Sequence, residues 1–384
     1  MFWAAQITKA IQLQHAYVCR ACEKEGKGQI KKAVLPRPMI ANSLGSNSLV
    51  IETIRQKFIQ KVPAYRQEDY WHQQFGLAIS RENITNWHRL VVRNGLDFVA
   101  ERLRHYMKQD DILYADETSY QVIESQKAKT YYWQFCTGKD SPYPTVLYLH
   151  SESRAGSFPK EILKDYAGYL HCDGYKGYNQ VENVQLVYCL AHARRKFFDA
   201  LPKGNKKEDI PAFIGTKMMD VWFELERKWA VLTPEERLVK RQNELKPLFN
   251  NFYEWLSSFQ PAGGSKLEKA VNYALAHRSG YELLFEDGRL ELSNNLSERN
   301  IKELVIGRKN WLHSTSLEGA WSSGILLSII RTARANQLDP IKYLTFLFEK
   351  LPNLEVLDEA HVDALLPWHQ TVKEQCGFTY QIDK

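Results

Sequence analysis

The spacing of apolar residues changes along the 384-residue chain, and these changes require a mixed fold built from several parts. Residues 41–108 repeat apolar side chains at helical spacing. Residues 109–203 instead hold short runs rich in Tyr, Val, Ile and Trp between turn residues, which is typical of strands. Residues 204–283 are helical only. The sequence therefore predicts an α/β unit that a helical block interrupts, that resumes at residues 284–350 and that ends in a tail at 351–384.

The composition is that of an ordinary globular protein. Hydrophobic residues make up 44% of the chain and charged residues 25%. The apolar run around Ile325–Ile330 is far shorter than the ~18 residues of a membrane helix, and the start of the chain lacks the pattern of a secretory signal. Six scattered cysteines indicate reduced thiols. We therefore expect a cytoplasmic protein without a membrane partner.

Basic charge is concentrated at the N-terminal end. Residues 1–105 contain 16 Lys and Arg against 8 Asp and Glu, a net charge of +8, whereas the rest of the chain contains 35 against 37, a net charge of −2. Localised positive charge is typical of proteins that bind polyanions, because neutralised phosphates release their counterions. A merely solvated basic face explains the same count, so charge alone leaves nucleic-acid binding open.

Three helices are predicted before residue 109, and the last two have the outline of a helix-turn-helix. Leu49–Ile59 and Arg66–Phe75 are periodic, Gly76 ends the second helix, and Ser80 is a good N-cap for a third helix that ends near Val92. In a helix-turn-helix this last helix enters a DNA groove. The polar residues it would present are Arg81, Asn83, Asn86, His88 and Arg89. A plain helical hairpin fits the same pattern.

Three acidic residues are expected at the ends of predicted elements, where a carboxylate can face a cleft. Asp116 and Asp173 each follow a predicted strand, and Glu298 lies in the first turn of a predicted helix. Converging oxygen ligands suit hard cations such as Mg²⁺, and two such ions ~3.5–4 Å apart can activate a nucleophile and stabilise a leaving oxygen. The structural alternative is that the aspartates cap turns and that Asn295 and Glu298 cap their own helix.

Longer strings around these acidic residues resemble the bacterial insertion sequence 66 family of transposases in identity, order and spacing. The strings are Ala115-Asp116-Glu117-Thr118, Asp173-Gly174-Tyr175-Lys176-Gly177-Tyr178, Ala191-His192-Ala193-Arg194-Arg195-Lys196-Phe197, Asn294-Asn295-Leu296-Ser297-Glu298-Arg299 and Gly307-Arg308-Lys309-Asn310-Trp311. The resemblance covers about residues 10–370, and it includes the tail segment Leu365-Leu366-Pro367-Trp368.

The resemblance implies a ribonuclease H-like mixed sheet core of the Asp-Asp-Glu type, interrupted by an all-helical insertion and preceded by a helix-turn-helix-like DNA-binding domain. By position, Asp116, Asp173 and Glu298 match the family's metal-binding triad, which would hold Mg²⁺ or Mn²⁺. The interval from Asp173 to Glu298 is much longer than the interval from Asp116 to Asp173, because the helical block lies within it. The implied reaction is metal-dependent strand cleavage by water at the ends of an insertion element, followed by attack of the freed 3′ hydroxyl on target DNA.

The partners that the resemblance implies are the DNA of the element ends and of the target, further copies of the chain in the DNA complex, and small accessory proteins of the element. The expected location is the nucleoid in a bacterial cytoplasm. Two other functions stay open: a catalytically idle DNA-binding protein that represses or interferes, and a general metal-dependent nuclease. An intact acidic triad favours the transposase.

Basic side chains near the acidic strings are candidates for binding a DNA strand. Cationic groups contact phosphates, and aromatic rings stack on unpaired bases. The candidates are Arg194, Arg195, Lys196, Arg308, Lys309, Trp311 and His313. Runs of charge are often only solvated faces, which is the structural alternative here.

Cys189 and His192 form a Cys-x-x-His element similar to one that some transposases with this core carry after the second Asp. The structural alternative is a buried strand cysteine beside a histidine at a helix start. Because the sequence shows no two further ligands nearby, we expect a structural or substrate-positioning role rather than zinc binding.

Residues 1–40 are typical of a partial zinc knuckle followed by a stiff Pro-containing linker. Cys19, Cys22 and at most His15 supply three of the four ligands that a structural zinc ion needs. Members of the family precede this pair with a further cysteine pair. We therefore expect an N-terminally shortened chain with an empty half site and weak recognition of the element ends.

Overall fold

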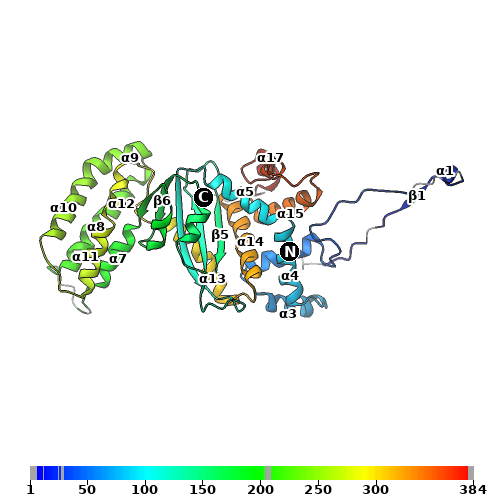
Figure 1. Cartoon of the computed structure of the whole chain (residues 1–384), viewed down its shortest axis with the longest axis horizontal. Helices are drawn as coiled ribbons and strands as arrows, with labels where there is room; N and C mark the ends of the chain where they lie inside the picture. Colours follow the sequence, from blue (N-terminus) through cyan, green and yellow to red (C-terminus); the bar gives the residue numbers. More distant parts are fainter. Residues whose placement is uncertain are drawn as a thin grey trace, which may run out of the picture.

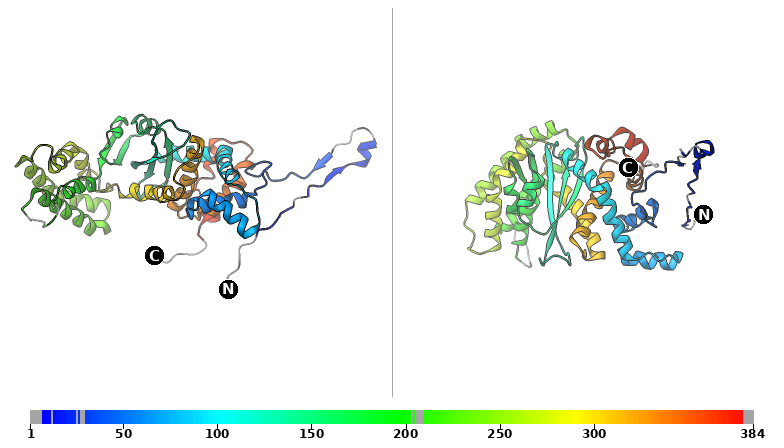
Figure 2. Two further views of the ribbon diagram at one scale, coloured as in Figure 1. Left: turned by 90° about the horizontal axis from the view of Figure 1, so that it is seen from below. Right: turned by 45° about the vertical axis from the view of Figure 1, so that its right-hand side comes forward.

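The computed structural model describes residues 7–11, 13–24, 26, 30–202, 204 and 209–378. A central mixed sheet separates two helical regions, one formed by the helical block and the other by the N-terminal helices together with the C-terminal part of the chain (Figure 1). Both further views show the same elongated arrangement (Figure 2). No helix of the described part of the chain is long and apolar enough to cross a membrane. The prediction of a mixed α/β chain is confirmed.

The sheet has five strands in the order β5-β4-β3-β6-β7. Strands β3, β4 and β5 are antiparallel neighbours, whereas β6 and β7 continue the sheet parallel to β3. The bounds are β3 (Ile112–Tyr120), β4 (Thr130–Thr137), β5 (Val146–Ser151), β6 (Gly168–Cys172) and β7 (Val184–Tyr188). All five strands were predicted from their runs of β-branched and aromatic residues.

Both faces of the sheet are covered by helices. Helices α13 (Asn295–Trp311) and α14 (Leu317–Ala335) pack on one face over β3, β4 and β5. Helix α6 (Ser157–Ile162) and the 3₁₀ turn Lys176–Gln180 lie against the other face. The sheet is therefore a buried layer between two sets of helices.

Helix α14 also covers the outer edge of the sheet. The backbone N–H groups of Val146 and Tyr148 on the edge strand β5 donate to the hydroxyl oxygens of Thr332 and Ser328, at 3.0 and 2.7 Å. Gly324 permits this approach, because a Cβ there would lie 2.4 Å from the Tyr148 carbonyl oxygen. An edge covered in this way cannot pair with another strand.

The N-terminal helices follow the predicted pattern closely. Helix α2 (Asn47–Ile54) continues as a wider turn to Ile59, and α3 (Ala64–Phe75) ends at Gly76, whose φ of 64° is left-handed. Ser80 caps α4 (Arg81–Val91) by accepting a hydrogen bond from the Asn83 N–H at 3.2 Å. Helix α5 (Asp97–Met107) follows after a kink at Gly95.

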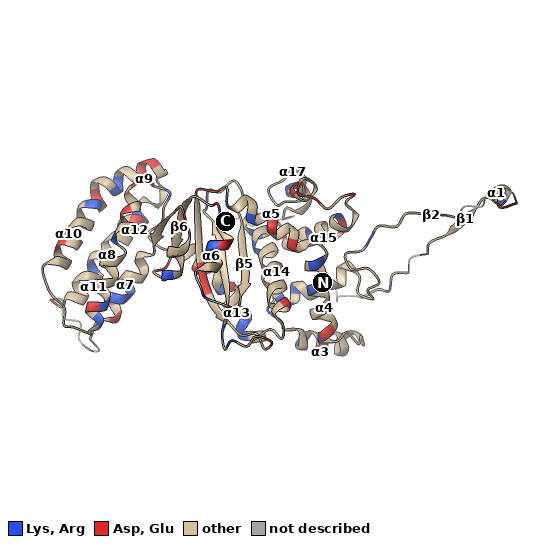
Figure 3. Ribbon diagram, viewed as in Figure 1, with Lys and Arg blue, Asp and Glu red and all other residues tan. Residues whose placement is uncertain are grey.

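The helical block lies beyond β7 at the far end of the sheet (Figure 1). Its helices are α7 (Leu190–Asp199), α8 (Pro211–Lys228), α9 (Pro234–Lys240), α10 (Lys246–Ser257), α11 (Lys266–Ala276) and α12 (Arg278–Glu282). Helix α8 begins at Pro211, because proline is suited to a first helical turn. Lys, Arg, Asp and Glu are interleaved along these helices (Figure 3).

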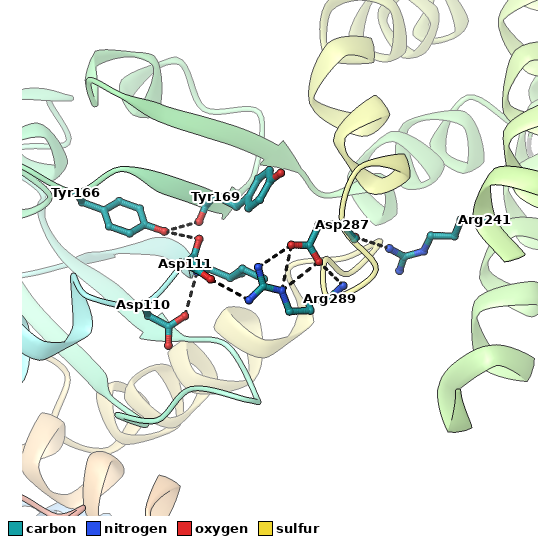
Figure 4. Close-up of polar contacts among 8 residues, drawn as sticks. Asp110, Asp111, Tyr166, Tyr169, Arg241, Asp287 and Arg289 are labelled. Carbon is teal, nitrogen blue, oxygen red and sulfur yellow. Dashed lines mark hydrogen bonds and ion pairs between the residues drawn. The ribbon is translucent and has the colours of Figure 1, made fainter. Parts of the chain in front are cut away.

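A chain of polar contacts joins the helical block to the sheet (Figure 4). The fully buried Arg241 pairs with Glu226 at 2.6 Å and also donates to the carbonyl oxygens of Leu284, Asp287 and Leu290. Arg289 then links Asp287, at 2.7 Å, to Asp111 beside the start of β3, at 2.9 Å. The loop that returns from the helical block is therefore held to the sheet at a defined place.

The tail returns to the N-terminal region. Helices α15 (Pro340–Lys350), α16 (Glu359–Asp363) and α17 (Gln370–Cys376) pack near α5, where Arg102 pairs with Asp363 at 2.7 Å. The strands β1 (Ala16–Val18) and β2 (Ile30–Lys32), with α1 (Arg20–Lys24), form a hairpin that projects from the body (Figures 1 and 2).

Candidate active site

Asp116 lies within β3, and the prediction that it follows the end of a strand is wrong. The strand continues to Tyr120 because β4 pairs with its whole second half, with Asp116 directly opposite Gln134. Asp173 follows the end of β6 as predicted. The parallel pair of Tyr114 and His171 lies two residues earlier on both strands. Continuing this register places Asp116 beside Asp173 on the same face of the sheet.

The face that carries Asp116 is the one beneath α13. Directly opposite residues of an antiparallel pair share a face, and Gln134, opposite Asp116, hydrogen-bonds to Ser297 on α13. The next residue, Glu117, is opposite Trp133 and therefore points to the other face. Asp116 and α13 are thus on the same side of the sheet.

Glu298 lies in the first turn of α13, whose N-terminus is fixed to the sheet. The Asn294 side chain donates to the Ala115 carbonyl oxygen at 2.8 Å. The N-cap is Asn294 and makes no side-chain capping bond, so the alternative in which Asn295 and Glu298 cap the helix is wrong. One carboxylate oxygen of Glu298 is buried and has no hydrogen-bond partner in the part of the chain that the structure describes. A buried acceptor without a partner is suited to bind a cation.

The electrostatics of this cluster favour the binding of a cation. Burial, with the neighbouring Glu117 next in size, raises the pKa of Asp116 to about 8, and Asp173 and Glu298 add smaller contributions of the same sign. Among the described residues, no ion pair involves Asp116, Asp173 or Glu298. Carboxylates in this setting are poorly compensated without a cation.

Glu117 belongs to the same region but has its own partners. Its side chain is 2% exposed, it accepts a hydrogen bond from the Tyr178 hydroxyl at 2.7 Å, and it pairs with Arg154. The guanidinium of Arg154 also lies 4.0 Å above the ring of Tyr175. Sequence reasoning missed this residue as part of the site, although strand alternation places it directly behind Asp116. The contacts indicate that Glu117 holds the segments of Arg154 and Tyr178 against β3.

Cys189 and His192 lie next to Glu298. Their ligand atoms and those of Glu298 all lie within 4.8 Å of one another, and this is the one such His, Cys, Asp and Glu group found among the described residues. Asp116 and Asp173 are outside it. Glu298 thus supplies one further ligand, from the far side of the helical block in the sequence, which the sequence did not show. The structural or substrate-positioning role of Cys189 and His192 stays a prediction.

The helical block contributes two residues that sequence reasoning also missed. Asp173 forms a tight turn in which its carboxylate accepts the Tyr175 N–H at 2.8 Å. A Cβ on Gly174 in this turn would lie 2.6 Å from both the Tyr273 hydroxyl and the His277 ring. Since Tyr273 and His277 are distant from Gly174 in the sequence, no local pattern signals them. The insertion therefore forms one wall beside Asp173.

Comparison with known families gives a direct result. Residues 42–322 match the protein family described as "Transposase IS66 family". Residues 328–368 match the family described as "IS66 C-terminal element". The chain belongs to the IS66 transposase family. Both matches agree with the resemblance inferred from the acidic strings and from the tail segment.

Relatives that align over most of this chain occur in Sinorhizobium fredii. The uncharacterized protein y4hP is 27% identical over 380 residues, which cover 93% of this chain and 67% of y4hP. The uncharacterized protein y4jD is 26% identical over 371 residues, which cover 92% of this chain and 71% of y4jD. The chain thus spans about two thirds of the length of these relatives.

In this IS66-family chain, two of the three basic residues of α7 that were predicted to bind DNA contact other side chains. Arg194 pairs with Asp220 on α8 at 2.5 Å, and the Lys196 ammonium lies 4.6 Å above the ring of Tyr273. Arg195 is exposed and, with Arg194, lines a cavity of about 740 Å³ between α7 and α8. Lys196 is therefore the α7 cation that contacts the wall beside Asp173.

At the end of α13, some of the predicted DNA-binding residues also contact other parts of the chain, and others are exposed. Arg308 donates to the Thr118 hydroxyl at 3.1 Å and to the Ser119 carbonyl, so it ties the helix to β3. Lys309 is exposed. Trp311 packs edge-on against Phe58 with ring centres 6.1 Å apart. These contacts join α13 to the N-terminal helices.

A groove of about 760 Å³ runs between α4 and the end of α13. Residues that line it include Lys57, Arg81, Arg89, Trp311 and His313. It therefore brings together basic and aromatic side chains that the sequence had placed in two separate groups.

The predicted groove-facing residues of α4 differ in their surroundings. Arg81, Asn83 and Asn86 are exposed, whereas Arg89 pairs with Glu318 on α14 at 3.1 Å. His88 is buried and hydrogen-bonds to the Thr53 hydroxyl at 3.1 Å, so its prediction as a groove-facing residue is wrong. His88 lies on the side of α4 that packs against α2, which carries Thr53.

Cys19 and Cys22 are both exposed at the tip of the projecting hairpin. Hydrogen bonds from the backbone and side chain of Cys22 lower the pKa of Cys19. His15 lies near Tyr17, with ring centres 6.4 Å apart. Zinc occupancy of this half site stays a prediction.

Proposed function

We propose that this chain is a DNA transposase that cuts and joins strands at the ends of an insertion element, with Asp116, Asp173 and Glu298 as its catalytic carboxylates. The observation that carries the proposal is the placement of Asp116, Asp173 and Glu298 on one side of the sheet, where burial and neighbouring carboxylates raise the pKa of Asp116, within a chain of the IS66 transposase family. The sheet order, with Asp116 on the central strand, supports a ribonuclease H-like core.

The donor set fits divalent cations such as Mg²⁺ or Mn²⁺. Asp116 and Asp173 would hold them, and Glu298, which has a buried oxygen without a partner, would complete the site. When bound, such ions make water a stronger nucleophile and stabilise the leaving 3′ oxygen. The role of the protein is to fix these carboxylates on β3, β6 and α13, so that scissile phosphate and attacking group meet in one orientation.

We further propose that α3 and α4 form a helix-turn-helix that contacts DNA through Arg81, Asn83 and Asn86. The groove between α4 and α13 supports this proposal, because it continues the basic surface toward Trp311 and His313. Arg195 and Lys196 would contact the DNA strand beside Asp173, where the helical block borders the acidic cluster. Copies of the chain and accessory proteins of the element would complete the DNA complex.

The proposal is tested by cleavage of a duplex that carries the terminal repeat of the element encoding this chain. The wild-type chain should cut the end in Mg²⁺ or Mn²⁺ and not in EDTA, and Asp173→Asn should lower the rate by at least ~100-fold. Glu182→Gln is the matched control, since it removes an exposed carboxylate that pairs only with Lys160. Thermal unfolding would verify that each variant is folded.

Three outcomes would overturn the proposal. Near-normal cleavage by folded Asp173→Asn would remove the assignment of the site. A wild-type chain that binds the end but cleaves no DNA with either metal would instead favour the catalytically idle DNA-binding protein. Cleavage without preference for the element end would favour the general nuclease.

A further inference from the structure

Cys189, His192 and Glu298 come together from two separate segments of the chain. Cys189 follows β7, His192 lies in the first turn of α7, and Glu298 lies in the first turn of α13. Their ligand atoms lie within 4.8 Å of one another. A thiolate, an imidazole and a carboxylate are the three kinds of side chain that bind zinc in proteins, and three protein ligands leave a fourth position open.

The backbone around these residues is fixed. The Leu190 N–H donates to the Leu292 carbonyl oxygen at 2.9 Å, which joins the start of α7 to the segment before α13. The Cys189 N–H donates to the Cys172 carbonyl oxygen at 3.0 Å, which joins the same point to the end of β6. The ligands therefore do not depend on mobile loops to meet, and preorganised ligands favour metal binding.

Some surroundings of the Cys189 sulfur favour the neutral thiol, and others favour the thiolate. Burial raises the pKa of its thiol to about 11, so the thiol is neutral in the metal-free protein. The Asn294 N–H nevertheless donates to the sulfur at 3.2 Å, and Cys189 is the N-cap residue of α7, where the positive end of the helix dipole lies. A cation at this place would displace the thiol proton, and the Asn294 N–H would then stabilise the thiolate.

Two atoms of the group lack the partners that buried polar atoms normally have. Nδ1 of His192 and one carboxylate oxygen of Glu298 are both buried without a hydrogen bond to any described residue. Native structures leave few buried polar atoms unsatisfied, and a bound ion is one of the accepted explanations. Both atoms belong to residues of the same small group, which supports a cation site there.

We infer that Cys189, His192 and Glu298 form a binding site for one Zn²⁺ ion, and that this ion competes with the catalytic metal ions for Glu298. The second half of the inference rests on the proposed function. The thiol of Cys189 releases its proton to solvent on binding. The thiolate and imidazole make the site selective for zinc over Mg²⁺, which prefers oxygen ligands. Zinc bound here would withdraw Glu298 from Asp116 and Asp173, so it would inhibit strand cleavage.

The site is tested with Co²⁺, which replaces zinc and gives a thiolate charge-transfer band in the near ultraviolet. The full-length chain would carry Cys19→Ser and Cys22→Ser, so that the thiols of the hairpin do not contribute. We expect one Co²⁺ per chain with this band, and loss of the band when Zn²⁺ is added. Cys189→Ser should abolish the band, and His192→Ala should weaken binding by at least ~10-fold.

Cys376→Ser is the matched control, because it removes another buried thiol, on α17, that is not part of the group. It should keep the band. The inference of a metal site is overturned if the folded parent shows no band, or if the band survives Cys189→Ser. Thermal unfolding of each variant excludes loss of the band through misfolding.

Competition is tested by measuring how strongly Zn²⁺ inhibits Mg²⁺-dependent cleavage, each variant being compared with its own zinc-free rate. The parent should lose most of its activity as the Co²⁺-binding site fills with zinc, and His192→Ala should need at least ~10-fold more zinc for the same loss. Equal inhibition of both proteins would overturn the competition. If the parent does not cleave at all, the proposed function fails, while the Co²⁺ spectrum still decides whether the metal site exists.

Discussion

Asp116 lies on β3 and Asp173 directly follows its parallel neighbour β6, each two residues beyond the paired residues Tyr114 and His171. This relationship brings two carboxylates to the same face of the sheet although three strands and a helix lie between them in the chain. Asp116 lies beneath α13, where burial and the neighbouring carboxylates disfavour its charged form in the absence of a cation. This electrostatic cost has consequences for stability as well as for chemistry.

The first prediction concerns the pH dependence of stability in metal-free protein. Since the pKa of Asp116 is about 8 in the folded chain and near 4 in an unfolded one, the folded chain binds more protons between these values. The free energy of unfolding should therefore fall as pH rises from about 5 to 8. Asp116→Asn should remove about 1–3 kcal/mol of this decrease, measured by urea unfolding at both pH values.

Adding Mg²⁺ at about pH 8 should raise the stability of the wild-type chain more than that of Asp116→Asn, because bound ligands stabilise the folded state. Glu182→Gln should behave as the wild type. Parallel stability curves for the wild type and Asp116→Asn, with and without Mg²⁺, would contradict the account of the acidic cluster.

The second prediction concerns DNA binding through α4. Arg81 is exposed and pairs only with the adjacent Glu82, whereas Arg89 is held by Glu318. Arg81→Ala should therefore weaken binding of the full-length chain to duplex DNA and lower the slope of log affinity against log salt by about one. Arg81→Ala with Arg89→Ala should weaken it further. The measurement is fluorescence anisotropy over a series of salt concentrations.

Lys228→Ala is a suitable comparison, because Lys228 is an exposed cation on the helical block. It should leave the affinity almost unchanged. Binding that does not respond to salt, or that is the same for Arg81→Ala and the wild type, would favour the plain helical hairpin over the helix-turn-helix.

The third prediction concerns the connection between the helical block and the sheet. Arg241 is fully buried and satisfies Glu226 and three carbonyl oxygens. Arg241→Met would leave these acceptors unpaired and should lower the free energy of unfolding by about 3–5 kcal/mol. Arg289→Ala removes a half-exposed pair and should cost only about 0–1 kcal/mol. Similar values for the two variants in urea unfolding would show that burial does not decide these energies.

Much of the fold was predictable because the signals that specify it are local. The five strands follow from runs of β-branched and aromatic residues. The end of α3 follows from Gly76, and the start of α4 follows from the hydroxyl of Ser80. Each of these features depends on residues within one or two turns of chain, so pattern and propensity are sufficient to find it.

The features that were missed depend on pairing between distant segments. The position of Asp116 within β3, rather than after a strand end, depends on the pairing of the second half of β3 with β4. The burial of His88 depends on Thr53 in another helix. Likewise, Cys189 and Glu298 lie on opposite sides of the helical block in the sequence, and Tyr273 reaches the turn after Asp173 only through the packing of that block. The sequence thus predicted the carboxylates of the site, but not the residues that surround them.

The central claim is that Asp173 holds a divalent cation during strand cleavage. It is tested most directly by Asp173→Cys, because a thiolate binds Mn²⁺ better than it binds Mg²⁺. Cleavage of the element end by this variant should fall by at least ~100-fold in Mg²⁺ and recover in part in Mn²⁺, relative to the wild type with the same metal. Near-normal cleavage in Mg²⁺, or an equal loss with both metals in a folded protein, would contradict the claim.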